Sequence, residues 1–311
     1  MLQLKIYTDV VAFYNDTYDL LMCHEAQNLI PLGNIIIGKK GEDKSGWRDP
    51  ANWFMATVSD NKDIQLVAIM TPPHNITLYA KDNRINEAAV SCLIEHIGVP
   101  VPGVMARKDM ATYFAQEYCS AKKVTCETAM EQRIYELTEV LTPLGKEVTP
   151  QSQTNNLIGG VINPEIPHKG KIRLAEESDM YFIPYWLEAF YSAEVFGSTT
   201  MNIPQNTENC LSLISQKKLF ILEENGKPVS IAGLTREMQN VCGVGYVYTP
   251  PYFRKRGYAT SCVAKLSRLI LDRGFSKCVL YTDLANPTSN SIYQAIGYRP
   301  ICDSVILKFK E

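Results

Sequence analysis

The sequence predicts an α/β protein whose mixed, largely antiparallel sheet is flanked by helices and occurs in two tandem domains. Two observations lead to this prediction. Short runs of β-branched and aromatic residues beside turn residues alternate with segments of helical periodicity along the chain. The order hairpin, third strand, helix, strand, helix, strand then occurs in each half of the 311 residues. A chain of this length can hold two domains of ordinary size, so we interpret the halves as two copies of one fold.

Composition and charge exclude several broad classes of protein. Apolar residues make up 46% and charged residues 21% of the chain, which is typical of a well-packed soluble protein. The net charge of −2 gives no general attraction to nucleic acid or to membrane surfaces, so neither is expected as a partner. No apolar run reaches the roughly 18 residues of a membrane-spanning helix, and the polar, charged start does not fit a signal peptide.

The cysteines and histidines indicate a reduced protein without a metal. The nine cysteines are scattered without a Cys-x-x-Cys motif, and there are only four histidines, so no metal site is expected. Unclustered thiols of this kind are typical of a cytoplasmic protein.

The first half contains the elements of the domain predicted over residues 1–140. The expected helices are Val10 to Ile30, a helix capped by Asn86 and running to Ile97, and Lys108 to Ser120. The expected strands are the hairpin Trp53 to Val58 and Ile64 to Met70, then Ile76 to Tyr79, a short strand entered from Val99 to Met105, and Arg133 to Val140. Residues 141–169 are rich in proline, glycine and polar residues, and we interpret them as a linker.

The second half contains the elements of the domain predicted over residues 170–311. The expected strands are one beginning at Lys171, then Leu219 to Glu223, Val229 to Arg236, Val241 to Tyr248, Cys278 to Thr282, Tyr298 to Cys302 and Val305 to Phe309. The expected helices are one capped by Ser178 or Asp179 and reaching about Phe196, then Cys210 to Gln216, Ala259 to Arg273, and Asn286 to Gly297. Asn225-Gly226 is a strong hairpin turn, because both residues tolerate positive φ.

A basic turn in the second half has the chemistry of an anion site. Pro250 and Pro251 end a strand, and a helix with an apolar face begins at Ala259. Between them stand Arg254, Lys255, Arg256 and Gly257. A helix N-terminus has free N–H groups and a partial positive charge, glycine allows close approach, and the basic side chains add charge. The turn therefore predicts a site for a phosphate or pyrophosphate.

The motifs of this half resemble those of a known superfamily. Arg254-Lys-Arg-Gly-Tyr-Ala259 matches the Arg/Gln-x-x-Gly-x-Gly/Ala signature of the GNAT superfamily of acyl-CoA-dependent N-acyltransferases. Further along, Asn286 stands seven residues before Tyr293, which looks like the later motif of the family. The two motifs occur in order, and the resemblance covers about residues 170–311. The whole chain resembles a bacterial group of tandem GNAT proteins whose N-terminal copy is degenerate.

The resemblance implies a role for each matching residue. Main-chain groups of Val247, Tyr248 and Thr249 would pair with the pantetheine arm of acetyl-CoA, as an added strand would. Asn286 would bind the pantetheine region, and Tyr293 would lie near the sulfur as the general acid. Backbone N–H groups of the turn would hold the pyrophosphate; its residues are Arg254, Lys255, Arg256, Gly257, Tyr258, Ala259 and Thr260.

The chemistry of the residues agrees with an acetyl transfer to a primary amine. An amine that attacks a thioester must be neutral, the carbonyl must be polarised, and the leaving thiolate needs a proton. The hydroxyl of Tyr293 can supply that proton, and a backbone N–H of the strand can polarise the carbonyl. No covalent enzyme intermediate is needed. Acetyl-CoA is therefore the expected cosubstrate, and the amine acceptor is left open.

Several alternatives remain at this stage. The basic turn could be an ordinary solvated turn, Asn286 could only cap its helix, and Tyr293 could be a core aromatic residue. The general base is not identified; Glu223 and Glu237 are candidates, and both could simply face solvent. If no base is present, the domain could be an acyl-CoA-binding sensor or regulatory module without turnover.

The acceptor and the first domain are the least defined parts. Either Tyr246 or Tyr248 could line the amine pocket. A cationic acceptor such as an antibiotic or polyamine would need acidic residues, for which Glu194, Glu208 and Glu237 are candidates. The first domain lacks a glycine after its third strand, so it is not expected to bind CoA. A homodimer is compatible with the sequence.

Overall fold

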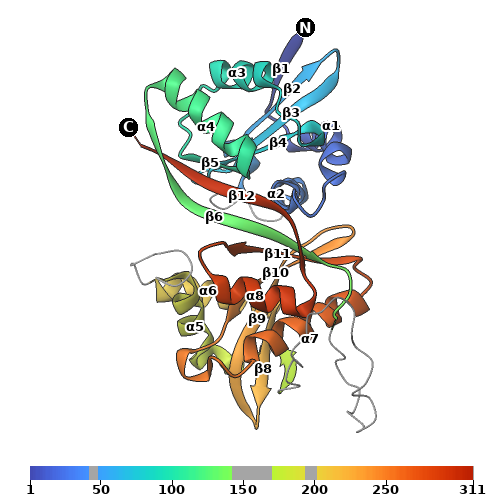
Figure 1. Cartoon of the computed structure of the whole chain (residues 1–311), viewed down its shortest axis with the longest axis vertical. Helices are drawn as coiled ribbons and strands as arrows, with labels where there is room; N and C mark the ends of the chain where they lie inside the picture. Colours follow the sequence, from blue (N-terminus) through green and yellow to red (C-terminus); the bar gives the residue numbers. More distant parts are fainter. Residues whose placement is uncertain (42–47, 142–169, 193–201, 311) are drawn as a thin grey trace, which may run out of the picture. The chain divides into compact units, whose positions relative to one another are not determined.

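The computed structural model describes residues 1–41, 48–141, 170–192 and 202–310 (Figure 1). The chain divides into two compact units. Unit 1 is Met1–Ile134, Thr282–Ala285 and Pro300–Glu311, and unit 2 is Tyr135–Tyr281 and Asn286–Arg299. Each unit is a sheet covered by helices on both faces, so the predicted fold class is confirmed.

Unit 1 has strands in the order β1-β2-β3-β4-β5-β12-β6. Neighbouring strands from β1 to β4 pair antiparallel, β4 and β5 pair parallel, and β12 pairs antiparallel with β5. The strands are β1 (Leu2–Tyr7), β2 (Phe54–Asp60), β3 (Asp63–Met70), β4 (Ile76–Ala80), β5 (Gly103–Arg107), β6 (Thr125–Leu137) and β12 (Arg299–Lys310). The helices are α1 (Val10–Met22), α2 (Leu29–Lys40), α3 (Glu87–His96) and α4 (Lys108–Lys122).

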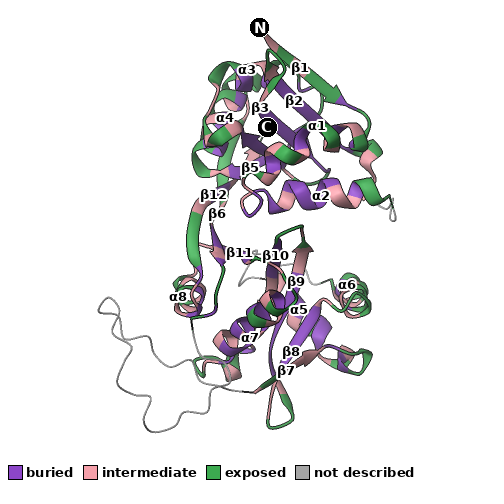
Figure 2. Ribbon diagram, turned by 90° about the vertical axis from the view of Figure 1, so that its right-hand side faces the viewer, coloured by how far each residue is buried: buried purple, intermediate pink, exposed green. Residues whose placement is uncertain are grey.

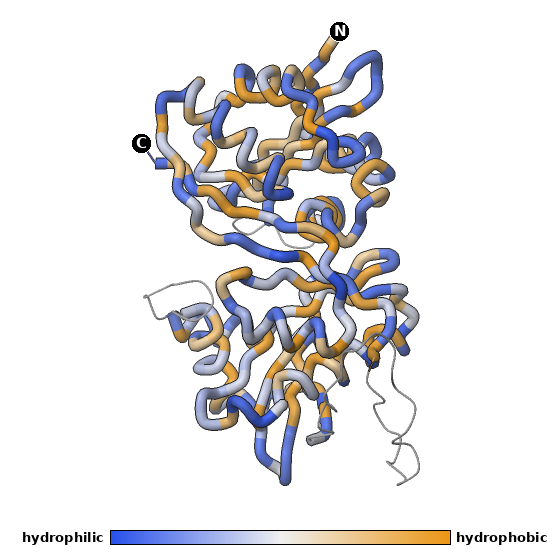
Figure 3. The backbone as a smooth tube through the Cα atoms, in the orientation of Figure 1, coloured by the Kyte–Doolittle hydropathy of each residue, from blue (hydrophilic) through white to orange (hydrophobic). Residues whose placement is uncertain are grey.

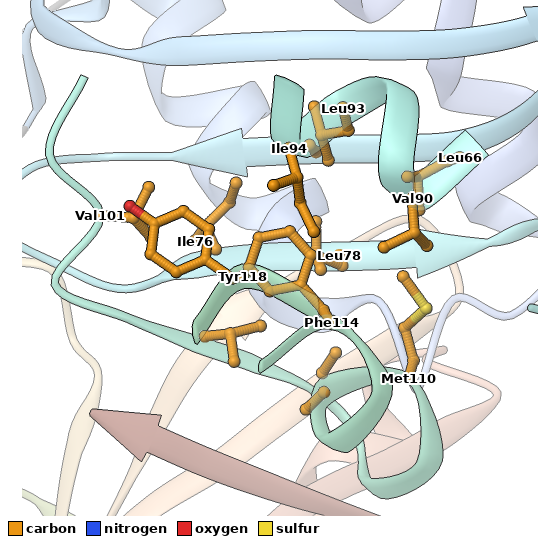
Figure 4. Close-up of a cluster of buried hydrophobic side chains, with 14 of the residues drawn as sticks. Leu66, Ile76, Leu78, Val90, Leu93, Ile94, Val101, Met110, Phe114 and Tyr118 are labelled. Carbon is orange, nitrogen blue, oxygen red and sulfur yellow. The ribbon is translucent and has the colours of Figure 1, made fainter. Parts of the chain in front are cut away.

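The core of unit 1 follows from the alternation of apolar residues along its strands. In β3, Leu66, Ala68 and Met70 point into a cluster beneath α3 and α4. Val67 and Ile69 are also buried, because the opposite face of the sheet is covered as well. Figure 4 shows residues of the two helices and of the strands packed together in that cluster: Val90, Leu93, Ile94, Met110, Phe114 and Tyr118 from the helices, and Leu66, Ile76 and Leu78 from the strands.

The last strand of the chain is part of the core of unit 1. In β12, Val305 lies opposite Ala106 and Leu307 lies opposite Val104, both of β5. Both β12 side chains are buried in the cluster beneath α3 and α4. The predicted ranges 1–140 and 170–311 therefore differ from the division into units, since residues 300–311 belong to unit 1 and the end of β6 belongs to unit 2.

Unit 2 has strands in the order β11-β10-β9-β8-β7. Neighbouring strands pair antiparallel from β7 to β10, and β10 pairs parallel with β11. The strands are β7 (Lys171–Leu174), β8 (Leu219–Glu224), β9 (Lys227–Glu237), β10 (Val241–Tyr248) and β11 (Lys277–Asp283). The helices are α5 (Ile183–Tyr191), α6 (Ile203–Ser215), α7 (Tyr258–Asp272) and α8 (Pro287–Ile296).

Both faces of the sheet of unit 2 are buried, as the purple strands beneath the helices show in Figure 2. One face carries the α7/α8 cluster, which contains buried residues of both helices such as Leu266 and Tyr293. The other face carries the α5/α6 cluster, which includes Leu187 and Cys210. The two names are used below for the two faces. In Figure 3 the same strands are largely hydrophobic in colour.

Several predicted elements were wrong in their bounds. The single helix expected over Val10 to Ile30 is two helices, α1 and α2, separated by a turn at residues 23–28. Strand β1 was not predicted, and β6 begins at Thr125 instead of Arg133. The two strands expected after Tyr298 are one continuous strand, because the polar residues between them are bonded: Ser304 donates to the carbonyl of Ala106.

The first helix of unit 2 begins later than predicted. Residues Glu177–Tyr181 form a 3-10 turn, and α5 starts only at Ile183. The reason is Asp179, whose carboxylate binds the guanidinium of Arg173 and the N–H of Glu176. The end expected at Phe196 and nearly all of the predicted linker lie outside the described residues.

The described residues also bear on membrane and metal binding. No helix among them is long and apolar enough to cross a membrane. The same residues contain no group of three or more His, Cys, Asp or Glu side chains that could hold a metal ion.

Candidate functional site

The site begins where β10 and β11 separate. Their parallel pairing covers three residue pairs, from Val241 with Lys277 to Gly243 with Val279. Beyond these pairs β10 continues to Tyr248 and β11 to Asp283, with no further pairing between them in the described register. The peptide groups of β10 that face β11 after Gly243 are therefore open to a ligand that lies along the strand.

A β-bulge in β10 alters which side chains face each side of this opening. Gly245 pairs with Gly233 and Tyr248 with Ile231, so two residues of β10, Tyr246 and Val247, lie opposite one residue of β9. Tyr246 has a φ of 54°, in the left-handed region. Such bulges re-aim side chains and turn peptide groups away from the regular ladder.

The bulge shifts the alternation of the strand by one residue. Before it, Cys242 and Val244 lie in the α7/α8 cluster. After it, Val247 packs on that cluster, whereas Tyr246 and Tyr248 pack on the α5/α6 cluster. Tyr246 and Tyr248 therefore share one face, as the sequence suggested. Cys242 and Val244, the even-numbered residues before the bulge, lie on the opposite face.

The basic turn lies directly after β10. Arg254, Lys255 and Arg256 are exposed, and Nε of Arg254 donates to the carbonyl oxygen of Thr249 at 2.9 Å. The Arg254 guanidinium also lies 5.8 Å from the ring centre of Tyr248. One basic side chain is thus held against the end of the strand, while the turn presents its positive charge to solvent.

The backbone of the turn opens the N-terminus of α7. Gly257 occupies the N-cap with a φ of 78°, a conformation that glycine adopts without steric cost. No side chain caps the helix at this position. The start of α7 therefore suits an anion such as a pyrophosphate, because helix N-termini present N–H groups and a partial positive charge.

Helix α8 carries the second motif. Asn286 is its N-cap: Oδ1 accepts from the N–H of Ser289 at 3.0 Å, and the carbonyl oxygen accepts from Nδ2 of Asn290 at 2.8 Å. The capping role that the sequence left open is therefore present. The cap uses one lone pair of Oδ1, and Nδ2 carries the donors that a ligand of Asn286 could accept from.

Tyr293 lies two helical turns after Asn286, on the buried side of α8. It is 7% exposed, and its ring centre lies 6.4 Å from that of Tyr135 and 6.0 Å from that of Tyr298. Burial raises the pKa of Tyr293 to about 12, because the phenolate is poorly solvated there. At neutral pH the phenol is therefore fully protonated, as a general acid must be.

The structure brings part of the predicted site together. Val247, Tyr258 and Tyr293 all belong to the α7/α8 cluster, although they come from β10, α7 and α8. The strand edge, the open helix start and the phenol are thus on one face of the sheet.

The predicted acidic residues are not part of this arrangement. Glu223 accepts from Nε of Arg173 at 2.8 Å, and exposed Glu237 lies 3.9 Å from Nζ of Lys218. Glu208 is exposed on α6, and Glu194 lies outside the described residues. Each candidate for the general base is therefore next to a basic side chain, Glu223 next to Arg173 and Glu237 next to Lys218.

Unit 1 differs at the equivalent position, which is the start of the helix that follows β4. Helix α3 is capped by Asn86, whose Oδ1 accepts from the N–H of Ala89 at 3.1 Å. A side-chain oxygen therefore takes an N–H that remains open in α7. An open cavity of about 560 Å³ adjoins the cap, and its charged lining is mixed: Asp63, Lys81, Asp82, Arg84 and Glu87.

Comparisons with known proteins agree with the fold and with the motifs. Residues 174–298 match the acetyltransferase (GNAT) family. No curated protein matches the chain. Among solved structures, a Drosophila protein is 11% identical with a TM-score of 0.65, covering 99% of this chain and 98% of its own.

Two further solved structures match over nearly their whole length. The GCN5-related N-acetyltransferase from Sphaerobacter thermophilus is 14% identical with a TM-score of 0.60, covering 99% of this chain and 95% of its own. The acetyltransferase from the GNAT family from Colwellia psychrerythraea is 13% identical with a TM-score of 0.55, covering 99% and 98%. At these identities the structures show that the fold of the whole chain, with both units, is shared.

Proposed function

Because residues 174–298 belong to the GNAT acetyltransferase family, we propose that unit 2 moves an acetyl group from acetyl-CoA to a primary amine. The observation that carries the proposal is the opening between β10 and β11 beside an uncapped, basic helix start. A strand edge suits an extended pantetheine arm, and a helix start suits a pyrophosphate.

In this proposal each part of acetyl-CoA meets a different element. The turn from Arg254 to Thr260 binds the pyrophosphate, mainly through backbone N–H groups. The main chain of Val247 to Thr249 pairs with the pantetheine arm, and Nδ2 of Asn286 contacts the same region. The thioester then lies near Tyr293, on the α7/α8 face.

The reaction is a direct displacement at the thioester carbonyl. The neutral amine forms a C–N bond, the C–S bond breaks, and the sulfur leaves as a thiolate that accepts the proton of Tyr293. A peptide N–H of the bulge in β10 can stabilise the charge on the carbonyl oxygen. The attacking nitrogen loses a proton to a base that the described residues do not identify, which is why Glu223 and Glu237 are not assigned this role.

Binding of acetyl-CoA to the full-length protein, measured by isothermal titration calorimetry, tests the proposal. We expect Arg254→Glu and Arg256→Glu each to weaken binding at least tenfold, because each places a negative charge beside the pyrophosphate. Arg268→Glu is the matched control: it changes the net charge equally on the same helix, about 15 Å from its start. Absence of binding at millimolar acetyl-CoA would refute the proposal, as would equal effects of all three variants.

The position of the acidic residues favours one alternative, an acyl-CoA-binding sensor without turnover. Both predicted base candidates are engaged by basic residues. The sensor predicts tight binding of acetyl-CoA without acetylation of any amine. Acetylated product that disappears in Tyr293→Phe would exclude it.

We further propose that unit 1 does not bind CoA, since Asn86 already caps the helix start that would receive a phosphate. A cytoplasmic location fits the nine cysteines, all of which are free thiols.

A further inference from the structure

Three side chains surround the β10–β11 opening on the α5/α6 face, the face opposite Tyr293. They are Arg236 of β9, Tyr246 of β10 and Tyr281 of β11, which come from three adjacent strands. Both tyrosines lie within electrostatic range of the Arg236 guanidinium. None of the three belongs to the residues expected to hold acetyl-CoA.

The register of the strands explains why Arg236 points to this face. Leu234 pairs with Val244 and Glu237 with Cys242, so β9 has two residues, Thr235 and Arg236, opposite Gly243. Leu234, Val244 and Cys242 lie in the α7/α8 cluster, and Glu237 is directly opposite Cys242. Arg236 precedes Glu237 and therefore projects to the other face.

The same pairing places Arg236 at the mouth of the opening. Gly243 is the last residue of β10 that pairs with β11, and Arg236 is level with it. Tyr281 follows the last paired residue of β11 by two positions, and its neighbour Leu280 lies in the α7/α8 cluster. Tyr281 thus shares the α5/α6 face with Arg236 and Tyr246.

The next step rests on the proposed function. Acetyl-CoA occupies the α7/α8 side of the opening, so the amine reaches the thioester from the α5/α6 side. Groups that surround the opening on that side contact the acceptor. Arg236 is the cation among them, and its Nε is shielded from solvent.

The charge of Arg236 selects the chemistry of the acceptor. Burial lowers the pKa of Arg236, but an arginine starts so high that it remains charged at neutral pH. Its planar guanidinium binds a carboxylate through two parallel hydrogen bonds, and a shielded site strengthens them. The hydroxyls of Tyr246 and Tyr281 can donate to the same anion. A polyamine would instead meet a like charge.

We infer that the acceptor is an amine that also carries a carboxylate, such as an amino acid, and that Arg236 binds this carboxylate. Arg236 is thus a specificity-determining residue of unit 2. The cationic acceptor considered from the sequence is disfavoured, since Glu208 and Glu237 are exposed and Glu237 lies beside Lys218.

The test compares matched pairs of amines with the full-length protein. Each of the twenty proteinogenic amino acids is paired with the amine lacking its carboxylate, for example phenylalanine with phenethylamine. Phosphoethanolamine and ethanolamine form a further pair that probes a phosphate. Acetylated products are measured by mass spectrometry with acetyl-CoA as the donor, and kcat/KM is compared within each pair.

We expect at least one amino acid to be acetylated with a kcat/KM ten or more times that of its decarboxylated partner. Arg236→Gln should remove this preference by raising KM for the amino acid at least tenfold, while Arg236→Lys restores part of it. Acetyl-CoA affinity should stay within twofold in both variants. Arg268→Gln, the same change on the exposed side of α7, should alter neither quantity.

The outcomes separate this inference from the proposed function. Failure to bind acetyl-CoA overturns both. Three outcomes with acetyl-CoA bound overturn the inference alone. They are a preference for decarboxylated amines, a preference for phosphoethanolamine, and no acetylated product from the panel. The wild-type comparison needs no variant, so it stands even if Arg236→Gln fails to fold. Equal losses of kcat/KM for an amino acid and its decarboxylated partner in Arg236→Gln would also contradict the inference.

Discussion

Tyr293→Phe should abolish acetyl transfer and leave the fold intact. The substitution removes one oxygen from a side chain that is 7% exposed within the α7/α8 cluster. The described residues show no hydrogen bond to this phenol, so its loss leaves no buried partner unsatisfied. We therefore expect the free energy of unfolding at pH 8 to change by no more than about 1 kcal/mol. Loss of a general acid should lower kcat by roughly 10²- to 10⁴-fold.

The raised pKa of Tyr293 also predicts how the free energy of unfolding changes with pH. Burial raises the pKa to about 12 from the ordinary value of 10. The folded state therefore holds this proton more tightly than the unfolded state. The resulting stability is fully present below pH 10 and is lost as the pH rises through 12. Between pH 9 and pH 11, ionisation of this one group should lower the unfolding free energy of wild type by ~1.3 kcal/mol.

Urea unfolding of wild type and of Tyr293→Phe at pH 9 and pH 11 measures that difference, because the variant lacks the titrating group. The variant should lose about 1.3 kcal/mol less than wild type over this interval. Calorimetry with acetyl-CoA should give an affinity within twofold of wild type, since the phenol acts on the leaving sulfur and not on the pyrophosphate.

Tyr298→Phe is the matched control. Tyr298 is buried beside Tyr293, but its hydroxyl is hydrogen-bonded to Oγ of Ser267 at 2.7 Å. Removing this hydroxyl should cost about 1–2 kcal/mol of unfolding free energy and leave kcat within threefold. Wild-type turnover in Tyr293→Phe would refute the reasoning. Equal loss of turnover in both variants would also do so, because packing of the cluster would then explain the effect.

Two pairs of glycine substitutions, each a test and its control, probe the site and the fold separately. Gly257→Ala places a side chain at a φ of 78° on the start of α7 and should weaken acetyl-CoA binding about tenfold in calorimetry. The control Gly274→Ala, at a φ of 98° with open space around it, should not weaken acetyl-CoA binding. Gly103→Ala should lower the melting temperature of unit 1 by several degrees, because the added Cβ would lie 2.3 Å from the carbonyl oxygen of Leu307 in β12. Gly98→Ala, where nothing lies within 4 Å, should leave it unchanged, and equal shifts in calorimetric scans would contradict the predicted clash.

The local parts of the candidate site were predictable because they depend on neighbouring residues. Gly257 is needed at a position of positive φ, and the basic residues precede it in the sequence. The bulge at Tyr246 was not predictable. It is defined by the pairing of β10 with β9, and the sequence of β10 alone is a continuous run of apolar residues and glycines. Arg236 was missed for the same reason, since a second bulge in β9 decides which face it occupies.

The last strand shows the same limit at the level of the fold. Val305 and Leu307 have the alternation of any half-buried strand, so the pattern predicts a strand and cannot name its partner. Proximity in sequence favours a strand of the second half. Yet β12 pairs with β5, and its contacts there include Nζ of Lys308 to Oδ1 of Asn75. A truncation designed from the sequence at residue 170 would therefore remove a core strand from unit 1.

The two units differ at a single backbone position that bears on the proposed anion site. In both, a strand is followed by a turn and a helix, and the next strand pairs parallel with the first. In unit 1 the side chain of Asn86 turns back onto the helix start and takes the N–H of Ala89. In unit 2 Gly257 has no side chain that could do so. Glycine in place of a capping side chain costs a helix only about a few tenths of a kcal/mol, so the start of α7 lacks a cap's contacts at little loss of stability. Binding of a pyrophosphate would restore those contacts, which is why we place the single acetyl-CoA site in unit 2.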